Sequence, residues 1–262
     1  MVKIALIGNG GIAADLLEHV NRNKDHLEVV GILDAPDVKD PPHKDLLVKD
    51  LEALLALQPD VVVECATVTA VADYVERVLT AGTDVIAVSI GGFVLGDVME
   101  RCQVAAAKSG ARLHLVAGAL AGVDGIAAGT YGKLKSVTYQ SRKPPKAWIG
   151  SPGTEGVVFT GLDEPLVLFQ GTARQAATKY PKNANATATV AFAGLGLDGT
   201  KVELIADPAV ERNIHRIHVE GEFGAFTIEM RGMPSRLNPR TSALTVLSVI
   251  RAIENRDAPI VV

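Results

Sequence analysis

The stretch Lys3-Ile4-Ala5-Leu6-Ile7-Gly8-Asn9-Gly10-Gly11-Ile12-Ala13 decides the fold of this chain. An apolar run of strand length meets a glycine-rich turn, and a helical pattern follows over Ile12–Val20. This order is typical of a βαβ unit that binds a dinucleotide, although a purely structural glycine turn is the alternative. Gly8 allows the sharp turn off the strand, Gly10 leaves room for a pyrophosphate, and the start of the helix attracts its charge. Four residues are expected to bind the cofactor: Gly8, Gly10, Gly11 and Ile12.

A carboxylate follows the next strand at the distance that the same motif requires. Residues 27–33 have the composition of a strand, and Asp34 comes directly after them. An acidic side chain here accepts hydrogen bonds from the adenine ribose and would repel a 2′-phosphate. The alternative is a turn-forming Asp before Ala35-Pro36. Because no Arg or Lys follows before Lys39, we expect Asp34 to favour NAD as cofactor, without excluding NADP.

The composition predicts a soluble cytoplasmic protein. The chain has 262 residues, 48% of them hydrophobic, which suits one large domain or two modest ones. A net charge of −4 gives no sign of nucleic-acid binding. Cys65 and Cys102 form no metal or redox motif, and a disulfide framework is absent, as in a reducing compartment. No apolar run reaches membrane-spanning length, and the sequence enters its first strand at once, so we expect no membrane segment and no signal peptide.

Strands and helices alternate through the first part of the chain. After the first two strands, the pattern predicts helix 50–57, strand 60–64, helix 70–81, strand 84–88, helix 97–109 and strand 112–116. These strands are apolar throughout, as in a parallel sheet covered on both faces. The alternation predicts an α/β fold, a Rossmann-type doubly wound parallel sheet, over residues 1–120.

Mostly small residues follow three of these strands, at the edge where such a sheet binds ligands. They are Glu64–Thr67, Ser89–Gly92 and Gly118–Gly122. Each stretch alone fits a tight turn, but their shared position favours a rim around the nicotinamide ribose, with Ala66 on it. We interpret Cys65 as a packing residue, because no basic partner for a nucleophile is apparent nearby.

The pattern changes after residue 120. It predicts helices at 124–131, 172–180 and 186–193, and strands at 136–142, 201–206, 213–220 and 225–231. Helices at one end of a run of antiparallel strands indicate an α+β domain over residues 121–237, for substrate binding and oligomerisation. A last helix is predicted to open at Asn238-Pro239, a cap residue followed by proline at the first helical position. Its apolar residues cover much of its circumference, so it is expected to be buried on more than one side.

Strand alternation separates two of the six histidines. Along 214–220, odd-numbered residues share one face and even-numbered residues the other. His215 therefore points with Ile217 and Val219 towards a core or cleft, whereas His218 points towards water. The two histidines cannot bind one metal ion together, and we expect no metal site. His215 could still be a core histidine without a catalytic role. The remaining four are interpreted as structural: His19, His26, His43 and His114.

Cationic and hydroxyl side chains that could hold a carboxylate are Arg142, Lys143, Arg240, Thr241 and Ser242. Thr241 and Ser242 would lie in the first turn of the closing helix, where the dipole favours an anion. Each of these residues could instead be a solvated surface residue or a cap. Asn183 and Asn185 could be caps of the following helix, or amide donors to the nicotinamide or the substrate.

Several segments together resemble the L-aspartate dehydrogenase family. They are Gly8-Asn9-Gly10-Gly11-Ile12, Gly118-Ala119-Leu120-Ala121-Gly122-Val123-Asp124, Arg142-Lys143-Pro144-Pro145, Tyr180-Pro181-Lys182-Asn183-Ala184-Asn185, Ala206-Asp207-Pro208, Asn213-Ile214-His215 and Asn238-Pro239-Arg240-Thr241-Ser242. The resemblance covers essentially the whole chain, with minor departures at Tyr180 and Ala186. The family is similar in architecture to dihydrodipicolinate reductase and homoserine dehydrogenase.

The resemblance implies an oxidoreductase that converts L-aspartate, with NAD or NADP, to iminoaspartate, which hydrolyses to oxaloacetate and ammonia. A role in NAD biosynthesis follows by analogy. The resemblance also implies that His215 is catalytic, and that Ala119 and Asn185 contact the cofactor. Histidine suits the task, because its unperturbed pKa of about 6.5 allows proton transfer near neutral pH. We expect the substrate to be held by Lys143, Asn185, Thr241 and Ser242.

The same resemblance implies that the closing helix, in residues 238–262, returns to the nucleotide domain, and that the protein is a homodimer or a larger homo-oligomer. Two other functions stay open on the sequence. One is a dehydrogenase or imine reductase for another small acid, such as homoserine. The other is a non-catalytic NAD-binding sensor, against which His215 and the cationic loop Lys143-Pro144-Pro145-Lys146 argue.

Overall fold

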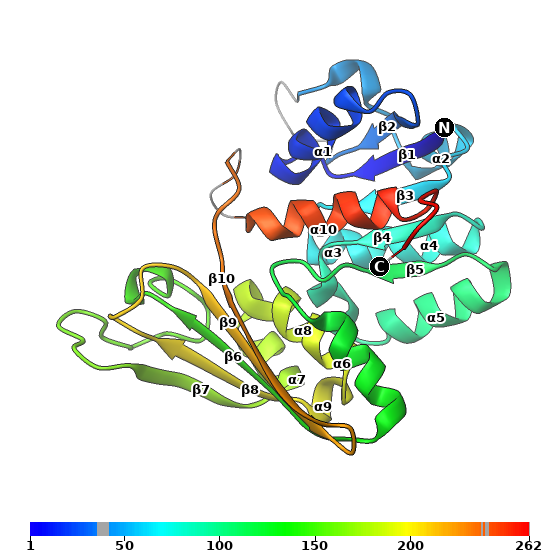
Figure 1. The fold of residues 1–262 in the computed structure, drawn as a ribbon. Helices are drawn as coiled ribbons and strands as arrows, with labels where there is room; N and C mark the ends of the chain where they lie inside the picture. The colour runs from blue at the N-terminus through cyan, green and yellow to red at the C-terminus, as the bar shows by residue number, and fades with distance from the viewer. Residues whose placement is uncertain (36–41, 237, 239–240, 262) are drawn as a thin grey trace. The chain divides into compact units, whose positions relative to one another are not determined.

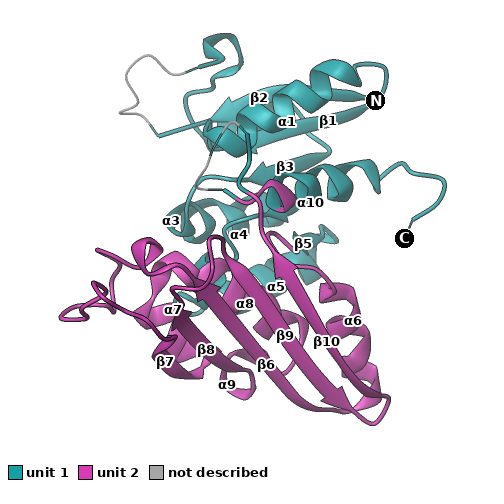
Figure 2. Cartoon of the chain, turned by 60° about the vertical axis from the view of Figure 1, so that its left-hand side comes forward, with its two compact units in different colours: residues 1–116, 234–241, 245–262 teal, residues 117–233, 242–244 magenta. Residues whose placement is uncertain are grey.

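The computed structural model describes residues 1–35, 42–236, 238 and 241–261. It divides into two compact units, shown in different colours in Figure 2. The first contains residues 1–116, 234–241 and 245–262, and the second contains residues 117–233 and 242–244. Each unit has its own five-stranded sheet. Within the described ranges, no helix is long and apolar enough to cross a membrane.

The first unit is built on a parallel sheet in the order β2-β1-β3-β4-β5 (Figure 1). Its strands are β1 (Val2–Ile7), β2 (Leu27–Leu33), β3 (Val61–Glu64), β4 (Asp84–Ala87) and β5 (Leu113–Leu115). Its helices are α1 (Gly11–Arg22), α2 (Leu51–Ala56), α3 (Val68–Ala70), α4 (Glu76–Thr80), α5 (Val98–Ser109) and α10 (Ala243–Glu254), with short η1 (Lys44–Leu46) and η3 (Ile90–Val94). The Rossmann-type fold expected from the sequence is confirmed. The single helix predicted over 70–81 contains a π-helical turn, η2 (Val71–Val75), between α3 and α4.

Both faces of this sheet are buried at its centre, where β1, β3 and β4 carry mostly apolar side chains on either side. Side chains of β1 such as Ile4 and Leu6 pack into one core with residues of α1 and α10. Ala5 and Ile7, which point to the other face, are equally buried. Glu254, in the last turn of α10, accepts hydrogen bonds from His19 at 2.7 Å and from His26 at 2.9 Å. Helix α10 is therefore tied to the first unit by apolar packing and by these hydrogen bonds.

The second unit is built on a mixed sheet in the order β10-β9-β6-β8-β7. Its strands are β6 (Leu134–Lys143), β7 (Leu166–Thr172), β8 (Lys201–Ala206), β9 (Ile214–Gly221) and β10 (Gly224–Arg231). Its helices are α6 (Val123–Gly129), α7 (Ala173–Lys179), α8 (Ala184–Ala193) and α9 (Gly196–Gly199), with short η4 (Thr130–Gly132), η5 (Pro145–Ala147) and η6 (Pro181–Asn183).

This sheet differs from the predicted run of antiparallel strands in two respects. β6 and β8 pair in parallel, because the chain between them crosses over through α7 and α8. β7 was not predicted at all. Its register against β8 shifts between Val167 and Phe169, so its residues do not alternate regularly between buried and exposed. The strand therefore lacks the two-residue period by which strands are recognised.

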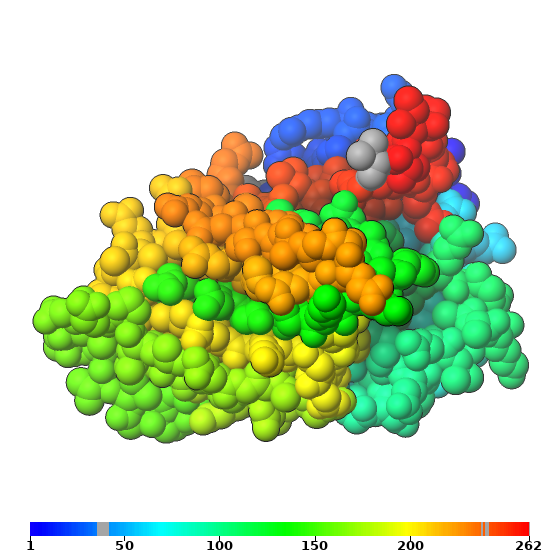
Figure 3. Space-filling view, turned by 60° about the horizontal axis from the view of Figure 1, so that its bottom comes forward, coloured from blue at the N-terminus to red at the C-terminus, as the bar shows by residue number. Residues whose placement is uncertain are grey.

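Among the described residues of the second unit, helices cover one face of its sheet. Alternate residues of β6, β8 and β9 form a core with apolar side chains of α6, α7 and α8. The other face carries polar side chains such as Thr138, Gln140 and Arg216. The edge strand β10 is largely exposed along its length, and its residues are visible in orange in the space-filling view of Figure 3.

The closing helix begins later than the sequence predicts. Helix α10 starts at Ala243, so Asn238 is not its cap, and Pro239 and Arg240 lie outside the described residues. Hydrogen bonds from Ser235 N to Thr241 O and from Ala243 N to Met233 O fix the backbone before the helix. The Asn238 carbonyl accepts a turn hydrogen bond from Thr241 N. Thr241 and Ser242 consequently precede the helix instead of forming its first turn, which corrects the sequence prediction.

Candidate active site

The first strand of the parallel sheet ends at a turn that only glycine can form. Gly8 has φ +106°, and a Cβ placed on it would lie 2.9 Å from the backbone of Ala66. The ends of β1 and β3 therefore approach each other closely, which brings Gly8 and Ala66 together. Cys65 lies beside them and is buried, and burial raises the pKa of its thiol. A thiol held protonated in this way is a packing residue, as expected.

Helix α1 begins with an open and uncharged first turn. Gly10, its N-cap, is exposed, and nothing lies within 4 Å of a Cβ built on it. No side chain caps this helix, and its first turn contains no acidic residue. The free N–H groups of the turn can therefore accept an anion such as a pyrophosphate. Gly11 is required for a different reason, because a Cβ there would lie 2.5 Å from the Asn238 side chain. Ile12 packs against the core of the unit.

Two carboxylates lie at the same edge of the sheet. Asp34 follows β2 directly and is partly exposed. Lys39, the first cation after it, lies outside the described residues. Glu64, at the end of β3, is completely buried and accepts hydrogen bonds from the N–H groups of Ala66 and Ser89, both at 2.9 Å. Burial raises the pKa of Glu64, and these N–H groups oppose the rise. Glu64 thus links the loops after β3 and β4, a role that the small residues around it did not suggest.

In the second unit, strand parity places His215 as predicted. His215 is 7% exposed on the covered face of β9, beside Ile217 and Val219, whereas His218 lies on the open face and bonds Thr227. The Tyr139 hydroxyl lies 2.7 Å from His215 Nδ1, and the two rings are nearly parallel. Nε2 has no hydrogen-bond partner among the residues that the structure describes. Burial, followed by the positive charge of Lys143, lowers the pKa of His215 to about 4, so the imidazole is neutral at physiological pH.

Lys143, the last residue of β6, is the cation on the same face as His215. Its ammonium group donates to Asn183 Oδ1 and lies 4.9 Å from the centre of the Trp148 ring. Burial, with a contribution from Lys182, lowers the pKa of Lys143 to about 8. A half-buried ammonium with one neutral hydrogen-bond acceptor is well suited to bind a carboxylate.

The remaining sequence candidates lie elsewhere. Asn183 is buried against Lys143, whereas Asn185 is exposed in the first turn of α8. Ala119 is half-buried in the turn that follows β5 and belongs to the second unit. Thr241 belongs to the first unit and Ser242 to the second. Ser242 Oγ is buried, with no hydrogen-bond partner in the described part of the chain.

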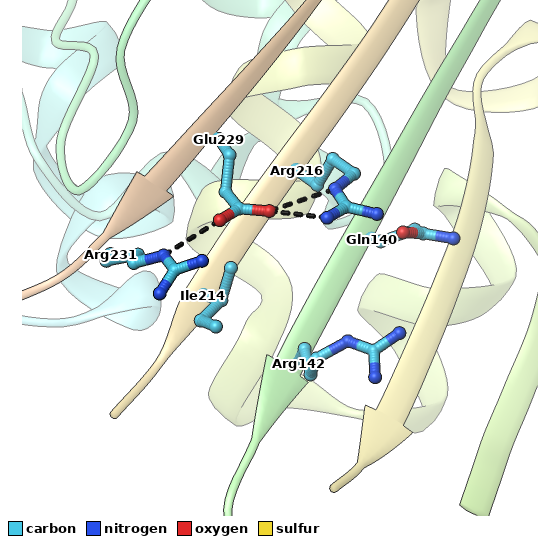
Figure 4. A pocket seen from close by; sticks show the side chains of 6 residues that line it. All are labelled: Gln140, Arg142, Ile214, Arg216, Glu229 and Arg231. Atoms are coloured by element: carbon cyan, nitrogen blue, oxygen red, sulfur yellow. Dashed lines mark hydrogen bonds and ion pairs between the residues drawn. The ribbon is translucent and has the colours of Figure 1, made fainter. Parts of the chain in front are cut away.

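Arg142 is adjacent to Lys143 but points to the open face of the sheet, where it pairs with the buried carboxylate of Asp207. Figure 4 shows it in a surface hollow beside two further arginines. Those two, Arg216 and Arg231, both donate to Glu229. Every guanidinium in this hollow therefore has a carboxylate partner, and Arg142 is separate from the cluster around His215.

Sequence reasoning missed two members of that cluster, Tyr139 and Ser141. Both are fully buried on β6, at the alternation that also places Lys143 on the covered face. Ser141 is directly opposite His215 in the register of β6 and β9. The available signal was the alternation along β6, which places Tyr139, Ser141 and Lys143 on the same face as the apolar Val137. Across the described ranges, no group of three or more His, Cys, Asp or Glu side chains could hold a metal ion.

Comparison with known proteins agrees with this arrangement over the whole chain. Residues 124–256 match the family model described as "Aspartate dehydrogenase, C-terminal", and residues 8–116 match "Homoserine dehydrogenase, NAD binding domain". An L-aspartate dehydrogenase from a Polaromonas strain is 40% identical over the full length of both chains. The L-aspartate dehydrogenase of Pseudomonas aeruginosa is 41% identical over 97% of each chain. The chain belongs to the L-aspartate dehydrogenase family.

Solved structures agree with this family in fold. The aspartate dehydrogenase of Thermotoga maritima superposes with a TM-score of 0.82 at 24% identity, over 100% of this chain and 99% of that one. A dihydrodipicolinate reductase from Paenisporosarcina has a TM-score of 0.55 at 15% identity, over 97% and 94% of the two chains. The architecture of this family member is thus shared with a reductase, as its sequence resemblance implies.

Proposed function

We propose that this protein oxidises L-aspartate to iminoaspartate with NAD as the hydride acceptor. Iminoaspartate then hydrolyses to oxaloacetate and ammonia. The observation that carries this proposal is the cluster of the buried His215 and Tyr139 with the half-buried Lys143 in a chain of this family. His215 and Lys143 lie on the same protected face of the sheet, so a base for the substrate amine and a cation for a substrate carboxylate are offered together.

The first unit fits NAD in its own geometry. The uncharged first turn of α1 and the open Gly10 leave room for a pyrophosphate, and Asp34 can accept hydrogen bonds from the adenine ribose. When bound, the nicotinamide supplies the carbon that accepts the hydride. We assign cofactor binding to Gly8, Gly10, Gly11, Ile12, Asp34 and Ala66 in this unit, and to Ala119 and Asn185 in the other.

His215 acts as the base in this proposal. The substrate nitrogen must lose a proton as its Cα loses hydride, and His215 Nε2 takes that proton: the substrate N–H bond breaks and an Nε2–H bond forms. In the free protein the imidazole is a weak base, because burial and Lys143 both oppose its protonation. Two substrate carboxylates nearby would raise the pKa of His215 again. The same imidazole can then direct water to the imine carbon.

Lys143 holds one substrate carboxylate. The partners of its ammonium group described above, Asn183 and the Trp148 ring, are both neutral. A substrate carboxylate would add an anionic partner. We assign supporting roles in substrate binding to Asn185 and to the hydroxyl groups of Thr241 and Ser242.

Aspartate-dependent formation of NADH by the purified protein tests the function. We expect turnover with L-aspartate and none with malate, which has the same carboxylates but no amine, or with L-homoserine. His215→Ala is the matched inactive control. NADH formation with homoserine and not with aspartate would contradict the proposal, and so would NAD binding without any turnover.

Assembly into a homo-oligomer and a cytoplasmic location remain predictions from the sequence and its family resemblance. Light scattering on the purified protein tests the first of these. A mass of about 27.5 kDa, that of one chain, would contradict it.

A further inference from the structure

Three side chains on the covered face of the second sheet form a buried polar row. Ser141 is opposite His215 in the β6–β9 register, and Tyr139 is two residues before Ser141 on the same strand. The Tyr139 hydroxyl lies 2.7 Å from His215 Nδ1. Tyr139 and Ser141 are both 0% exposed, so water does not reach their hydroxyl groups.

The direction of the Tyr139 hydrogen bond determines what His215 can do. Burial raises the pKa of Tyr139, so its hydroxyl keeps its single proton. While that proton is donated to His215 Nδ1, the neutral ring carries its own proton on Nε2 and cannot accept another there. A base at Nε2 requires the opposite direction, in which Nδ1–H donates to the tyrosine oxygen. The Tyr139 proton then needs a different acceptor.

Ser141 is the available acceptor. Its Oγ is buried and makes no hydrogen bond of normal geometry with any described residue. It lies on the same face of β6 as Tyr139 and directly opposite His215, and it lowers the pKa of the Tyr139 hydroxyl against the larger effect of burial. A buried hydroxyl without a partner is unfavourable unless another state of the protein uses it.

We infer that Ser141 and Tyr139 are positioning residues that set the proton of His215 on Nδ1 during the reaction. In this state His215 Nδ1–H donates to Tyr139 Oη, Tyr139 O–H donates to Ser141 Oγ, and Nε2 has a free lone pair. When Nε2 takes the substrate proton, the imidazolium keeps both of its N–H groups paired. No other proton in the row moves in this step, and the two hydrogen bonds keep their directions. This inference rests on the proposed role of His215 as base.

Ser141→Ala is the decisive variant, because it keeps the Tyr139–His215 contact but removes the acceptor behind it. Tyr139 then has only His215 as acceptor in the row, which favours the wrong tautomer. We expect kcat with aspartate to fall by roughly tenfold, since one buried hydrogen bond is lost in the protonated state. The KM for aspartate, NAD binding and the melting temperature should not change. Ser141→Thr, which restores a hydroxyl, should recover kcat.

A second measurement does not depend on turnover. Nitrogen NMR of ¹⁵N-histidine-labelled protein, with His215→Ala to assign the signal, reports the tautomer and titration of His215. Lys143 and Tyr139 are the charged and titratable groups that act on or contact His215, and Ser141→Ala alters neither. We expect the variant to move the titration of His215 to lower pH, because its imidazolium loses a partner.

Thr200→Val is the matched control. Thr200 Oγ1 is also buried without a partner among the described residues, but it precedes β8 at the end that pairs with Thr138, away from Ser141. It should leave kcat and the His215 titration unchanged. Wild-type kcat with an unshifted His215 titration in Ser141→Ala would overturn the inference, as would an equal loss of kcat in Thr200→Val. If the protein lacks aspartate turnover altogether, the proposed function fails, while the NMR titration still tests the hydroxyl row.

Discussion

The two sheets of this protein present their functional groups in opposite ways. In the parallel sheet both faces are covered by helices, so only the strand ends are open to a ligand, and the groups offered there are largely backbone N–H groups. In the mixed sheet one face is covered, and the functional groups are side chains that replace apolar residues on that face. His215, Tyr139 and Lys143 reach it from two neighbouring strands.

The difference has an energetic cause. Backbone N–H groups in the first turn of a helix have no intrahelical partner in any sequence, and glycine leaves them accessible to a ligand because it has no side chain. Polar side chains on a covered face lose water, and their properties shift as a result: the pKa of Lys143 falls to about 8 and that of His215 to about 4. The first site is therefore suited to binding, and the second to chemistry.

Removing the imidazole on the covered face should have the largest effect. We expect His215→Ala to lower kcat by roughly 10²–10⁴-fold, the range for a general acid–base group, with NAD affinity and melting temperature retained. His218→Ala removes a histidine three residues along the same strand, on the open face, where it bonds Thr227. Steady-state kinetics should find that variant within twofold or so of the wild type. Comparable losses in both variants would remove the functional distinction between the two faces.

The same division explains what the sequence could predict. The first strand of the parallel sheet, its glycine turn, the helix after it and the second strand that ends before Asp34 follow one another directly in the sequence. They could therefore be predicted from consecutive residues. The parity of His215 is also local, and it is confirmed. The neighbours of His215 are not local: Tyr139 is 76 residues away in the chain and meets it only through the β6–β9 register. The closing helix was misplaced because Asn238 and Pro239 resemble a helix start, whereas α10 begins at Ala243, after hydrogen bonds that join residues 233–235 to residues 241–243.

The cation of the covered face should give the next largest effect, in substrate binding. Lys143→Met should raise the KM for aspartate by roughly 10–150-fold, the equivalent of a charge-assisted hydrogen bond of about 1.5–3 kcal/mol. NAD affinity, measured by fluorescence titration, should not change. Lys146→Met, an exposed lysine three residues on, is the matched control. An unchanged KM in Lys143→Met would make Lys143 a structural lysine.

The lowered pKa of Lys143 adds a pH dependence with a definite sign. Its ammonium form binds the carboxylate and is lost as pH rises through about 8. The KM of the wild type should therefore rise above that pH, whereas the higher KM of Lys143→Met should not follow this titration. A wild-type KM that is flat from pH 7 to about pH 9 would contradict the assignment.

Coenzyme choice at the parallel sheet should respond more weakly, because most of the binding groups there are backbone. We expect Asp34→Ser to shift the ratio of NAD to NADP affinity by about tenfold towards NADP, since it removes one acceptor for the ribose and one repulsive charge. Asp25→Ser, at an exposed acidic residue just before β2, serves as control. Fluorescence titration with the two reduced coenzymes measures the ratio. A wild type that already prefers NADP would show that Asp34 does not select the coenzyme.

The smallest effect is expected where α10 is tied to the parallel sheet by charge. Burial raises the pKa of Glu254, but the hydrogen bonds from His19 and His26 outweigh it, so the pKa lies below its ordinary value of 4.5. The carboxylate therefore stabilises the fold above that pH, and this contribution is lost as pH falls through the lowered pKa.

Glu254→Gln should reduce the free energy of unfolding by only about 0.5–1 kcal/mol at pH 7, because the pair is partly exposed and Val249, Ala252 and Ile253 still hold the helix. Urea denaturation should show the gap to wild type closing below about pH 4, while Glu52→Gln, in an exposed pair with Arg77, should open no gap at either pH. A loss of several kcal/mol in Glu254→Gln would mean that charge, and not apolar packing, holds α10 on the parallel sheet.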